Sequence, residues 1–161
     1  MRSRTSNWFQ TKIRYEKVVE DGLLKKVTEL YVVDAMSHTE AEERITKEMR
    51  SYISGDFDVK GIVPAAYREI FFSDDSTADR YFKAKLQFVT FDEKTCKEKK
   101  SNVTYLVQAK DIHEALENVD ECMHGTMSDY TIVSIAETLV LDVYEYKNDN
   151  VVDGKMKAAG E

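Results

Sequence analysis

Hydrophobic and polar residues alternate near the start of the chain with the period of a half-buried strand. Over residues 8–18 one face carries Phe9, Thr11, Ile13 and Tyr15, and the opposite face carries Trp8, Gln10, Lys12 and Arg14. Residues 20–22 read Glu-Asp-Gly, a sequence that permits the positive φ of a tight turn. Residues 25–34 are therefore predicted to return as a second strand, paired with the first.

A helix follows this predicted hairpin, and two further strands follow the helix. Ser37 is placed to cap a helix that runs to about Tyr52, because Glu40 follows it at the spacing of a capping box. Residues 57–63 and 67–72 read as strands on either side of Pro64, the only proline of the chain.

The same series then begins again. Strands are predicted over 81–91 and 102–109, a helix from Asp111 to about Met123, and strands over 129–136 and 138–146. The helix of the first half carries Ser37, Glu40, Ala41, Ile45 and Met49, which recur 74 residues later as Asp111, Glu114, Ala115, Val119 and Met123. Flanking strand residues match at spacings of 73 or 74. Agreement in type, order and spacing indicates an internal duplication.

The predicted fold class is α+β. We expect two duplicated ββαββ units with antiparallel sheets and one helix each, related by an approximate two-fold axis. The expected boundaries are a flexible N-terminus at 1–6, repeats at 7–72 and 81–146, a linker at 73–80 and a disordered tail at 147–161. At 161 residues, the two repeats are expected to form one compact domain.

Composition narrows the class of protein further. Hydrophobic residues make up 42% of the chain, as in ordered globular proteins, and no apolar run approaches the roughly 20 residues of a membrane span. The N-terminal residues lack an apolar secretory core, so a cytoplasmic protein without a membrane partner is expected. Cys96 and Cys122 lack CxxC spacing. They are predicted to be reduced thiols, and neither a metal nor a cofactor is expected.

Charge is unevenly distributed along the chain. The net charge is −7, yet residues 1–28 hold seven basic and three acidic residues, and residues 80–104 again hold seven basic and three acidic residues. Each predicted first hairpin is therefore a basic segment of an acidic protein, whereas the helices and last strands are acidic.

Aromatic and basic residues share one predicted face in each half. Trp8, Lys12 and Arg14 lie on one face of the first strand, and Tyr81, Lys83 and Lys85 occupy the corresponding face of strand 81–91. Rings beside cations suit single-stranded nucleic acid, because bases stack on rings while Lys and Arg meet phosphates. The same aromatic residues could instead close a core edge or a dimer seam.

Catalytic motifs do not occur. The chain contains no GxSxG, GxGxxG, GxxxxGK[ST] or HxxxH sequence, and Cys96 has no evident partner histidine. A non-enzymatic binding protein is therefore predicted, with no catalytic residue.

Two alternatives to nucleic-acid binding stay open. One is a small nucleotide of the cyclic dinucleotide type, held between the halves or between subunits, since two related half-sites suit a symmetric ligand. The other is an assembly module that forms homo-oligomers through strand edges and aromatic residues.

Two resemblances bear on these choices. The element order looks like a circular permutation of the Whirly and PUR class of single-strand binders, although a shared fold does not establish a shared function. Residues 7–9, Lys12, Arg14 and Tyr15, together with 69–74, 105–109 and 125–130, resemble an uncharacterised family of short proteins from gut-type anaerobic bacteria and their tailed phages. This resemblance covers about residues 7–146. It implies a bacterial or phage-infected cytoplasm and brings no established activity.

Overall fold

The computed structural model of the chain describes residues 1–126 and 128–146 and shows an α+β protein, as predicted. Within these residues the elements of the first half of the chain are β1 (Arg2–Arg4), β2 (Trp8–Val18), β3 (Leu24–Asp34), α1 (His38–Tyr52), β4 (Phe57–Pro64) and β5 (Ile70–Phe72). Those of the second half are β6 (Arg80–Asp92), β7 (Lys97–Ala109), α2 (Ile112–Met123), β8 (Tyr130–Glu137) and β9 (Val140–Tyr144). The predicted tail at 147–161 lies outside the described residues.

Both helices begin where the sequence predicts, because each has a capping side chain. Ser37 Oγ accepts a hydrogen bond from the backbone N–H of Glu40 at 3.1 Å, and Asp111 Oδ1 accepts one from Glu114 at 2.8 Å. Each helix then buries a stripe at i+4 spacing. The stripe of α1 is Ala41, Ile45 and Met49, and that of α2 includes Ala115, Val119 and Met123.

The strands form two sheets that exchange one short strand each. One sheet has the order β4-β2-β3-β9 and the other the order β1-β5-β7-β6-β8. Strand β5 therefore leaves the first half of the chain to pair with β7, and β9 leaves the second half to pair with β3. Apart from β1, the two sheets have the same strand order, which is what a duplication predicts; common ancestry itself stays a prediction.

The exchanged pairs are parallel, so the prediction of purely antiparallel sheets is wrong for them. In the first sheet Val32 pairs with Val143. The corresponding pair in the second sheet is Leu106, 74 residues after Val32, with Ile70, 73 residues before Val143. The reason is geometric: a strand that crosses to the other sheet arrives beside β3 or β7 in the same direction as that strand. The remaining pairs are antiparallel, including the long hairpins β2–β3 and β6–β7.

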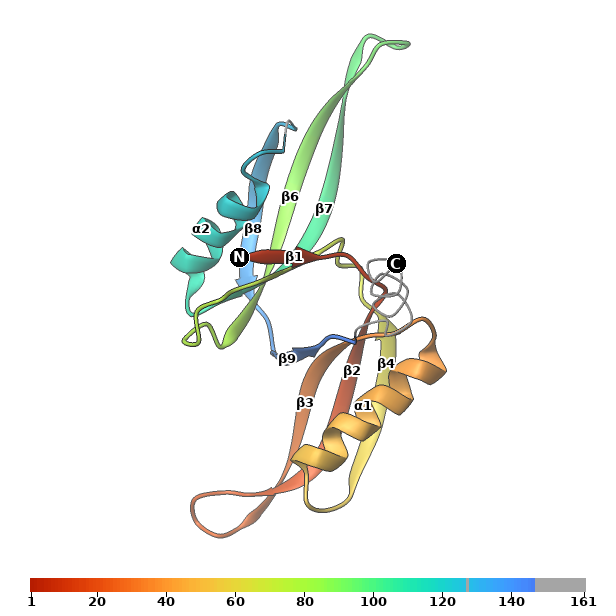
Figure 1. Cartoon of the computed structure of the whole chain (residues 1–161), viewed down its shortest axis with the longest axis vertical. Helices are drawn as coiled ribbons and strands as arrows, with labels where there is room; N and C mark the ends of the chain where they lie inside the picture. The colour runs from red at the N-terminus through yellow and green to blue at the C-terminus, as the bar shows by residue number, and fades with distance from the viewer. Residues whose placement is uncertain (127, 147–161) are drawn as a thin grey trace, which may run out of the picture.

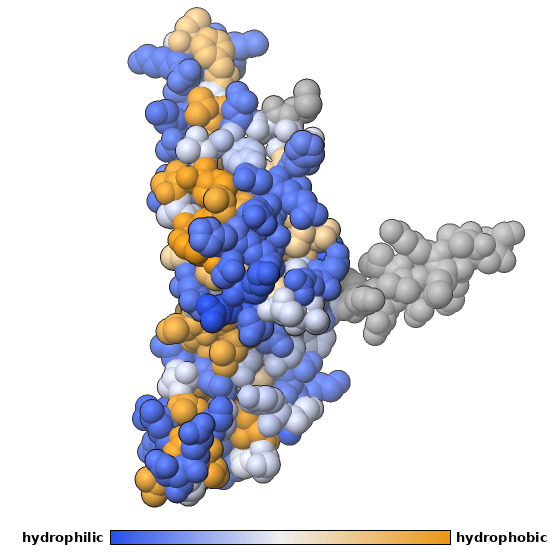
Figure 2. Space-filling view, turned by 90° about the vertical axis from the view of Figure 1, so that its left-hand side faces the viewer, coloured by the Kyte–Doolittle hydropathy of each residue, from blue (hydrophilic) through white to orange (hydrophobic). Residues whose placement is uncertain are grey.

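Both helices cover the same side of this elongated molecule (Figure 1). Helix α1 packs on β2, β3 and β4, and α2 packs on β5, β6, β7 and β8. Seen from the side, the surface opposite the helices is flat along the long axis, with apolar residues distributed among polar ones (Figure 2). We call this helix-free surface of the two sheets the open face. Its residues on the central strands are those that alternate with buried Ile13 on β2 and with buried Ala84 and Leu86 on β6.

Besides the cores beneath the two helices, another core joins the halves in the middle of the molecule. Open-face positions of both sheets become buried there. This central cluster consists of Trp8, Val32, Ile70, Phe72, Tyr81, Leu106, Val140 and Val143, with Ala65 and Tyr67 packed against it. Both exchanged strands contribute to it. The central cluster therefore packs the two sheets against each other.

The N-terminus, predicted to be flexible, contains a short strand in the structure. Strand β1 pairs with β5, and its two arginines reach the other half of the molecule. The Arg2 guanidinium donates two hydrogen bonds to Glu145, at 2.8 and 2.5 Å, and Arg4 is paired with Asp34 and Glu145. Arg2 also lies over the Phe72 ring, 4.3 Å from its centroid. These contacts make β1 a strap across both sheets.

Replacement of Glu145 with glutamine is expected to destabilise the protein by about 1–3 kcal/mol at neutral pH, because two charged donors lose their anionic partner. Hydrogen bonding from Arg2 lowers the pKa of the half-buried Glu145 carboxyl below its ordinary 4.5. Stabilisation by the carboxylate is therefore complete above about pH 4.5 and is lost as pH falls through the lower folded value. Urea unfolding at pH 7 and pH 3 should show a narrower gap in free energy of unfolding between wild type and Glu145→Gln at the lower pH. A constant gap would contradict this account of the strap.

Candidate nucleic-acid interface

The four predicted basic residues lie on the open face of the two central strands. Lys12, Arg14 and Lys83 are exposed, and Lys85 is partly exposed. Their positions correspond only partly between halves. Lys12 of β2 corresponds to Lys85 of β6, whereas Arg14 corresponds to a glutamine and Lys83 to Gln10.

The two predicted aromatic residues are buried, so their proposed role in stacking bases is wrong in this structure. Trp8 is 2% exposed and Tyr81 is 3% exposed, and both belong to the central cluster. The Tyr81 hydroxyl donates to Asp142 at 3.4 Å, and burial raises the pKa of this phenol. Within the described residues, Trp8 Nε1 has no hydrogen-bond partner. The structural alternative considered for these rings, closure of a core edge, is the one that the structure shows.

The basic residues of the two halves share one side of the molecule, in two groups. Trp8 and Tyr81 belong to the same cluster, and the cations continue from them along β2 and β6 on the same faces. Between the groups lies the β4–β5 connection, residues 65–69. Gln10 and Lys83 line a common small hollow of about 210 Å³ with Tyr67 of this connection. The connection thus divides the basic surface at the centre.

The balance of charge differs between the open face and the two helices. Strand register assigns six cations to the open face, namely Lys12, Arg14, Lys26, Lys83, Lys85 and Lys100, against three surface carboxylates, Glu16, Asp58 and Glu98. The helices carry eight carboxylates, namely Glu40, Glu42, Glu43, Glu48, Glu114, Glu117, Asp120 and Glu121, against Arg44, Lys47 and Arg50. The register also places Lys17, Lys25, Lys97 and Lys99 on the helix-side face of the hairpins. The open face therefore has an excess of cations and the helices an excess of carboxylates, although the whole chain has a net charge of −7.

Ion pairs with carboxylates neutralise some of the basic residues in the two segments that the sequence indicated. Arg2 and Arg4 are paired with carboxylates in the strap, and Arg80 lies 3.7 Å from Glu137. In contrast, none of the four predicted basic site residues forms an ion pair with a described carboxylate. Ion pairing therefore leaves the four open-face cations available to a ligand, together with lysines on the helix side of the hairpins, such as Lys17 and Lys99, that have no ion pair among the described residues.

An exposed ring that sequence reasoning missed lies further along β6. Phe91 is 63% exposed and follows Lys83 and Lys85 at even spacing, which places it on the open face. It is exposed because β8 pairs with β6 only as far as Phe88, so the end of the β6–β7 hairpin projects beyond the sheet. Continued alternation beyond Lys85 was the signal that could have identified it.

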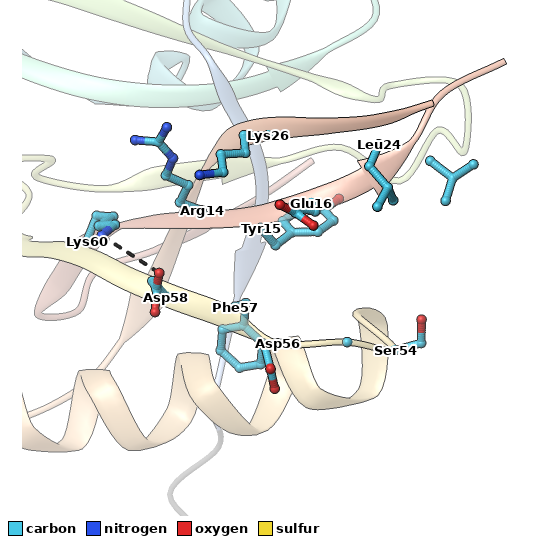
Figure 3. A pocket seen from close by; sticks show the side chains of 12 residues that line it. Arg14, Tyr15, Glu16, Leu24, Lys26, Ser54, Asp56, Phe57, Asp58 and Lys60 are labelled. Carbon is cyan, nitrogen blue, oxygen red and sulfur yellow. Dashed lines mark ion pairs between the residues drawn. The ribbon is translucent and has the colours of Figure 1, made fainter. Parts of the chain in front are cut away.

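A hollow lies at the corresponding end of the first sheet, where β4 stops and the β2–β3 hairpin continues, and its lining includes open-face residues such as Arg14 and helix-side residues such as Tyr15. We call it the first-sheet hollow. It has a volume of about 730 Å³, and Figure 3 shows its lining. The lining residues are Arg14, Tyr15, Glu16, Val18, Leu24, Lys26, Ser54, Gly55, Asp56, Phe57, Asp58 and Lys60. Polar, charged and apolar side chains therefore meet at one site.

Metal and thiol chemistry receive no support from the described residues. No group of three or more His, Cys, Asp or Glu side chains is placed there to hold a metal ion. Cys96 and Cys122 are free thiols. Burial raises the pKa of Cys122 to about 11, so this thiol is protonated at neutral pH and is a poor nucleophile.

Comparison with known proteins identifies a family without a known function. The family model that matches residues 7–146 is described as "Domain of unknown function (DUF4494)". The chain belongs to this family. Within DUF4494, the matched segment begins after strap strand β1 and includes both sheets' remaining strands and both helices. No curated protein and no solved structure matches the chain. Across residues 1–126 and 128–146, no helix has the length and apolar character needed to cross a membrane.

Proposed function

We propose that this DUF4494 protein is a non-enzymatic binding protein that holds single-stranded nucleic acid along its open face. The observation that supports this proposal is the uneven distribution of charge, with an excess of cations on the open face and an excess of carboxylates on the helices. A polyanion is attracted to the first surface and repelled by the second. The electrostatic field of the protein therefore directs the ligand to the open face.

Phosphates and bases have separate contacts in this arrangement. Lys12 and Arg14 on β2, and Lys83 and Lys85 on β6, neutralise phosphates. Phe91 takes the stacking role that sequence reasoning gave to the buried rings, because it is exposed on the same face. An unpaired strand suits this surface better than a duplex, since only unpaired bases can turn their apolar faces toward an exposed ring.

The double variant Lys12→Ala/Lys83→Ala is expected to weaken binding of a labelled oligothymidylate and to flatten its salt dependence. Each phosphate contact on a single strand contributes a slope of about 0.7 in log K against log salt, so the slope should fall in magnitude by about 1.4. Fluorescence anisotropy titrations at about 50–200 mM salt measure both the affinity and its salt dependence.

The matched control is Lys47→Ala/Arg50→Ala, which removes the same number of charges from exposed positions of α1. It should leave the slope unchanged, because the helices lie on the opposite side of the sheets. Equal effects of the two double variants would show that only net charge matters. No binding of wild type at tens of micromolar, on the order of weak non-specific affinities, would eliminate the proposed function.

A further inference from the structure

The first-sheet hollow has features of a site for a single nucleotide unit. We propose that it binds the phosphate monoester of a nucleotide, either a free mononucleotide or the phosphorylated end of a strand. For a strand end, this inference rests on the proposed function, since the hollow is then one end of the open-face track. For a free nucleotide, it stands independently. The volume of about 730 Å³ falls within the roughly 300–1,000 Å³ usual for small-ligand sites.

Two cations that lack a described ion-pair partner meet at one side of the hollow. Arg14 and Lys26 are diagonal neighbours on the same face of the β2–β3 pair, and both line the hollow (Figure 3). Strand register sets Lys26 opposite Glu16, yet the two form no ion pair in the described structure. Adjacent like charges repel each other, and a dianionic phosphate between them removes that repulsion. Arg14 supplies a planar pair of donors for phosphate oxygens.

Three carboxylates line the hollow beside its three cations, so a bound phosphate must compete with them. Asp58 lies opposite Arg14 in the strand register but is paired with Lys60, at 3.7 Å. Asp56 points away from Arg14 and Lys26, toward the side of α1 (Figure 3). Glu16 lies opposite Lys26 without an ion pair among the described residues, and it sets an electrostatic limit on affinity. Its neutralisation is therefore expected to strengthen phosphate binding.

Apolar side chains at the same site suit a nucleobase. Val18 and Leu24 are cross-strand partners beyond the end of β4, and they are 64% and 65% exposed. Tyr15 and Phe57 also line the hollow. A base laid against Leu24 covers apolar surface that the protein otherwise leaves in water. This contact distinguishes a nucleotide from inorganic phosphate.

The second half of the chain lacks an equivalent set of cations. The positions that match Arg14, Lys26 and Lys60 carry Gln87, Lys100 and Val133. One cation therefore replaces three. The hollow between the halves, about 210 Å³, is also smaller than usual ligand sites. We accordingly expect one nucleotide site per chain, in the first sheet, in place of two half-sites around a symmetric ligand.

The test uses the full chain and isothermal titration with adenosine monophosphate and with inorganic phosphate. Adenosine monophosphate should bind with a stoichiometry of one and more tightly than inorganic phosphate. Leu24→Ser should weaken binding of the nucleotide and leave the affinity for inorganic phosphate unchanged. Equal affinities for the two probes would overturn the assignment to a nucleotide, and a stoichiometry of two would overturn the assignment to one half.

Charge-matched variants locate the site. The exchange variant Arg14→Gln/Gln87→Arg keeps composition and net charge while it moves the guanidinium to the second half. It should weaken binding of adenosine monophosphate by about tenfold or more, the loss typical of removing a charged hydrogen bond. Glu16→Gln should tighten binding severalfold. Unchanged affinity in the exchange variant would overturn the site.

Oligonucleotides with and without a 5′-phosphate separate this inference from the proposed function. A preference for the phosphorylated strand that disappears in the exchange variant supports both. Equal binding of the two strands, with no binding of the mononucleotide, sinks the phosphate site and leaves the open-face function intact. Binding of the mononucleotide without binding of either strand removes the proposed function and keeps the phosphate site.

Discussion

Replacement of Trp8 with alanine is expected to lower the free energy of unfolding by about 3–5 kcal/mol, the usual cost of deleting a large buried aromatic side chain. Trp8 is 2% exposed, and its neighbours in the central cluster come from both sheets. The cavity left by the indole therefore lies where the two halves meet. Denaturant unfolding followed by circular dichroism measures the loss, since Trp8 is the only tryptophan available as a fluorophore.

Trp8→Phe is the matched variant that separates packing from ligand contact. It keeps a ring in the central cluster and removes the indole N–H, which has no described partner. We expect a smaller loss of stability than with alanine and unchanged affinity for an oligonucleotide. A fully folded Trp8→Phe protein that no longer binds would restore the stacking role that the structure argues against.

The sequence predicted the faces of β2 correctly but could not show what covers them. Alternation places Ile13 on one face and Trp8 with Lys12 on the other, and both assignments are confirmed. A pattern of period two identifies two faces, yet burial depends on what packs there. The start of the face that carries Trp8 is covered by the other sheet, and its continuation at Lys12 is exposed to solvent.

Local signals predicted the helices and hairpins, whereas the strand exchange depends on long-range packing. Ser37 and Asp111 are caps whose chemistry lies within three residues, so the sequence reveals them. Strands β5 and β9 are three and five residues long, and their apolar character suits either sheet equally well. Nothing local determines that each pairs with the other half. The strap at β1 was missed for the same reason, because Arg2 finds its partner at Glu145.

The candidate site residues show the same difference between what local sequence predicts and what depends on long-range packing. Cations such as Lys12 and Lys83 stay at the surface wherever a strand is placed, because burial without a partner is costly. Aromatic residues can be either buried or exposed. Trp8 lies near the junction of the sheets, whereas Phe91 lies beyond the end of β8, and this difference in position along the strand determines their exposure.

Replacement of Phe71 with alanine is expected to destabilise the second sheet, although Phe71 belongs by sequence to the first half. The ring is 1% exposed and stacks on Tyr105, with centroids 5.0 Å apart. It belongs to the cluster beneath α2, which includes Leu86 and Val119. A loss of about 3–5 kcal/mol follows from the buried area and the ring pair. Native-state hydrogen exchange should show the largest loss of protection in β6, β7 and α2.

Phe57→Ala provides the matched control for this prediction. Phe57 also belongs to the first half of the chain, but it packs against the core beneath α1 with Ile13 and Ile45. Its replacement should reduce protection in β2, β3 and α1 instead. The opposite responses of two phenylalanines from the same half depend on the crossing of β5 to the second sheet, because only that crossing carries Phe71 away from its sequence neighbours. Loss of protection around α1 in both variants would mean that β5 remains with its own half in solution.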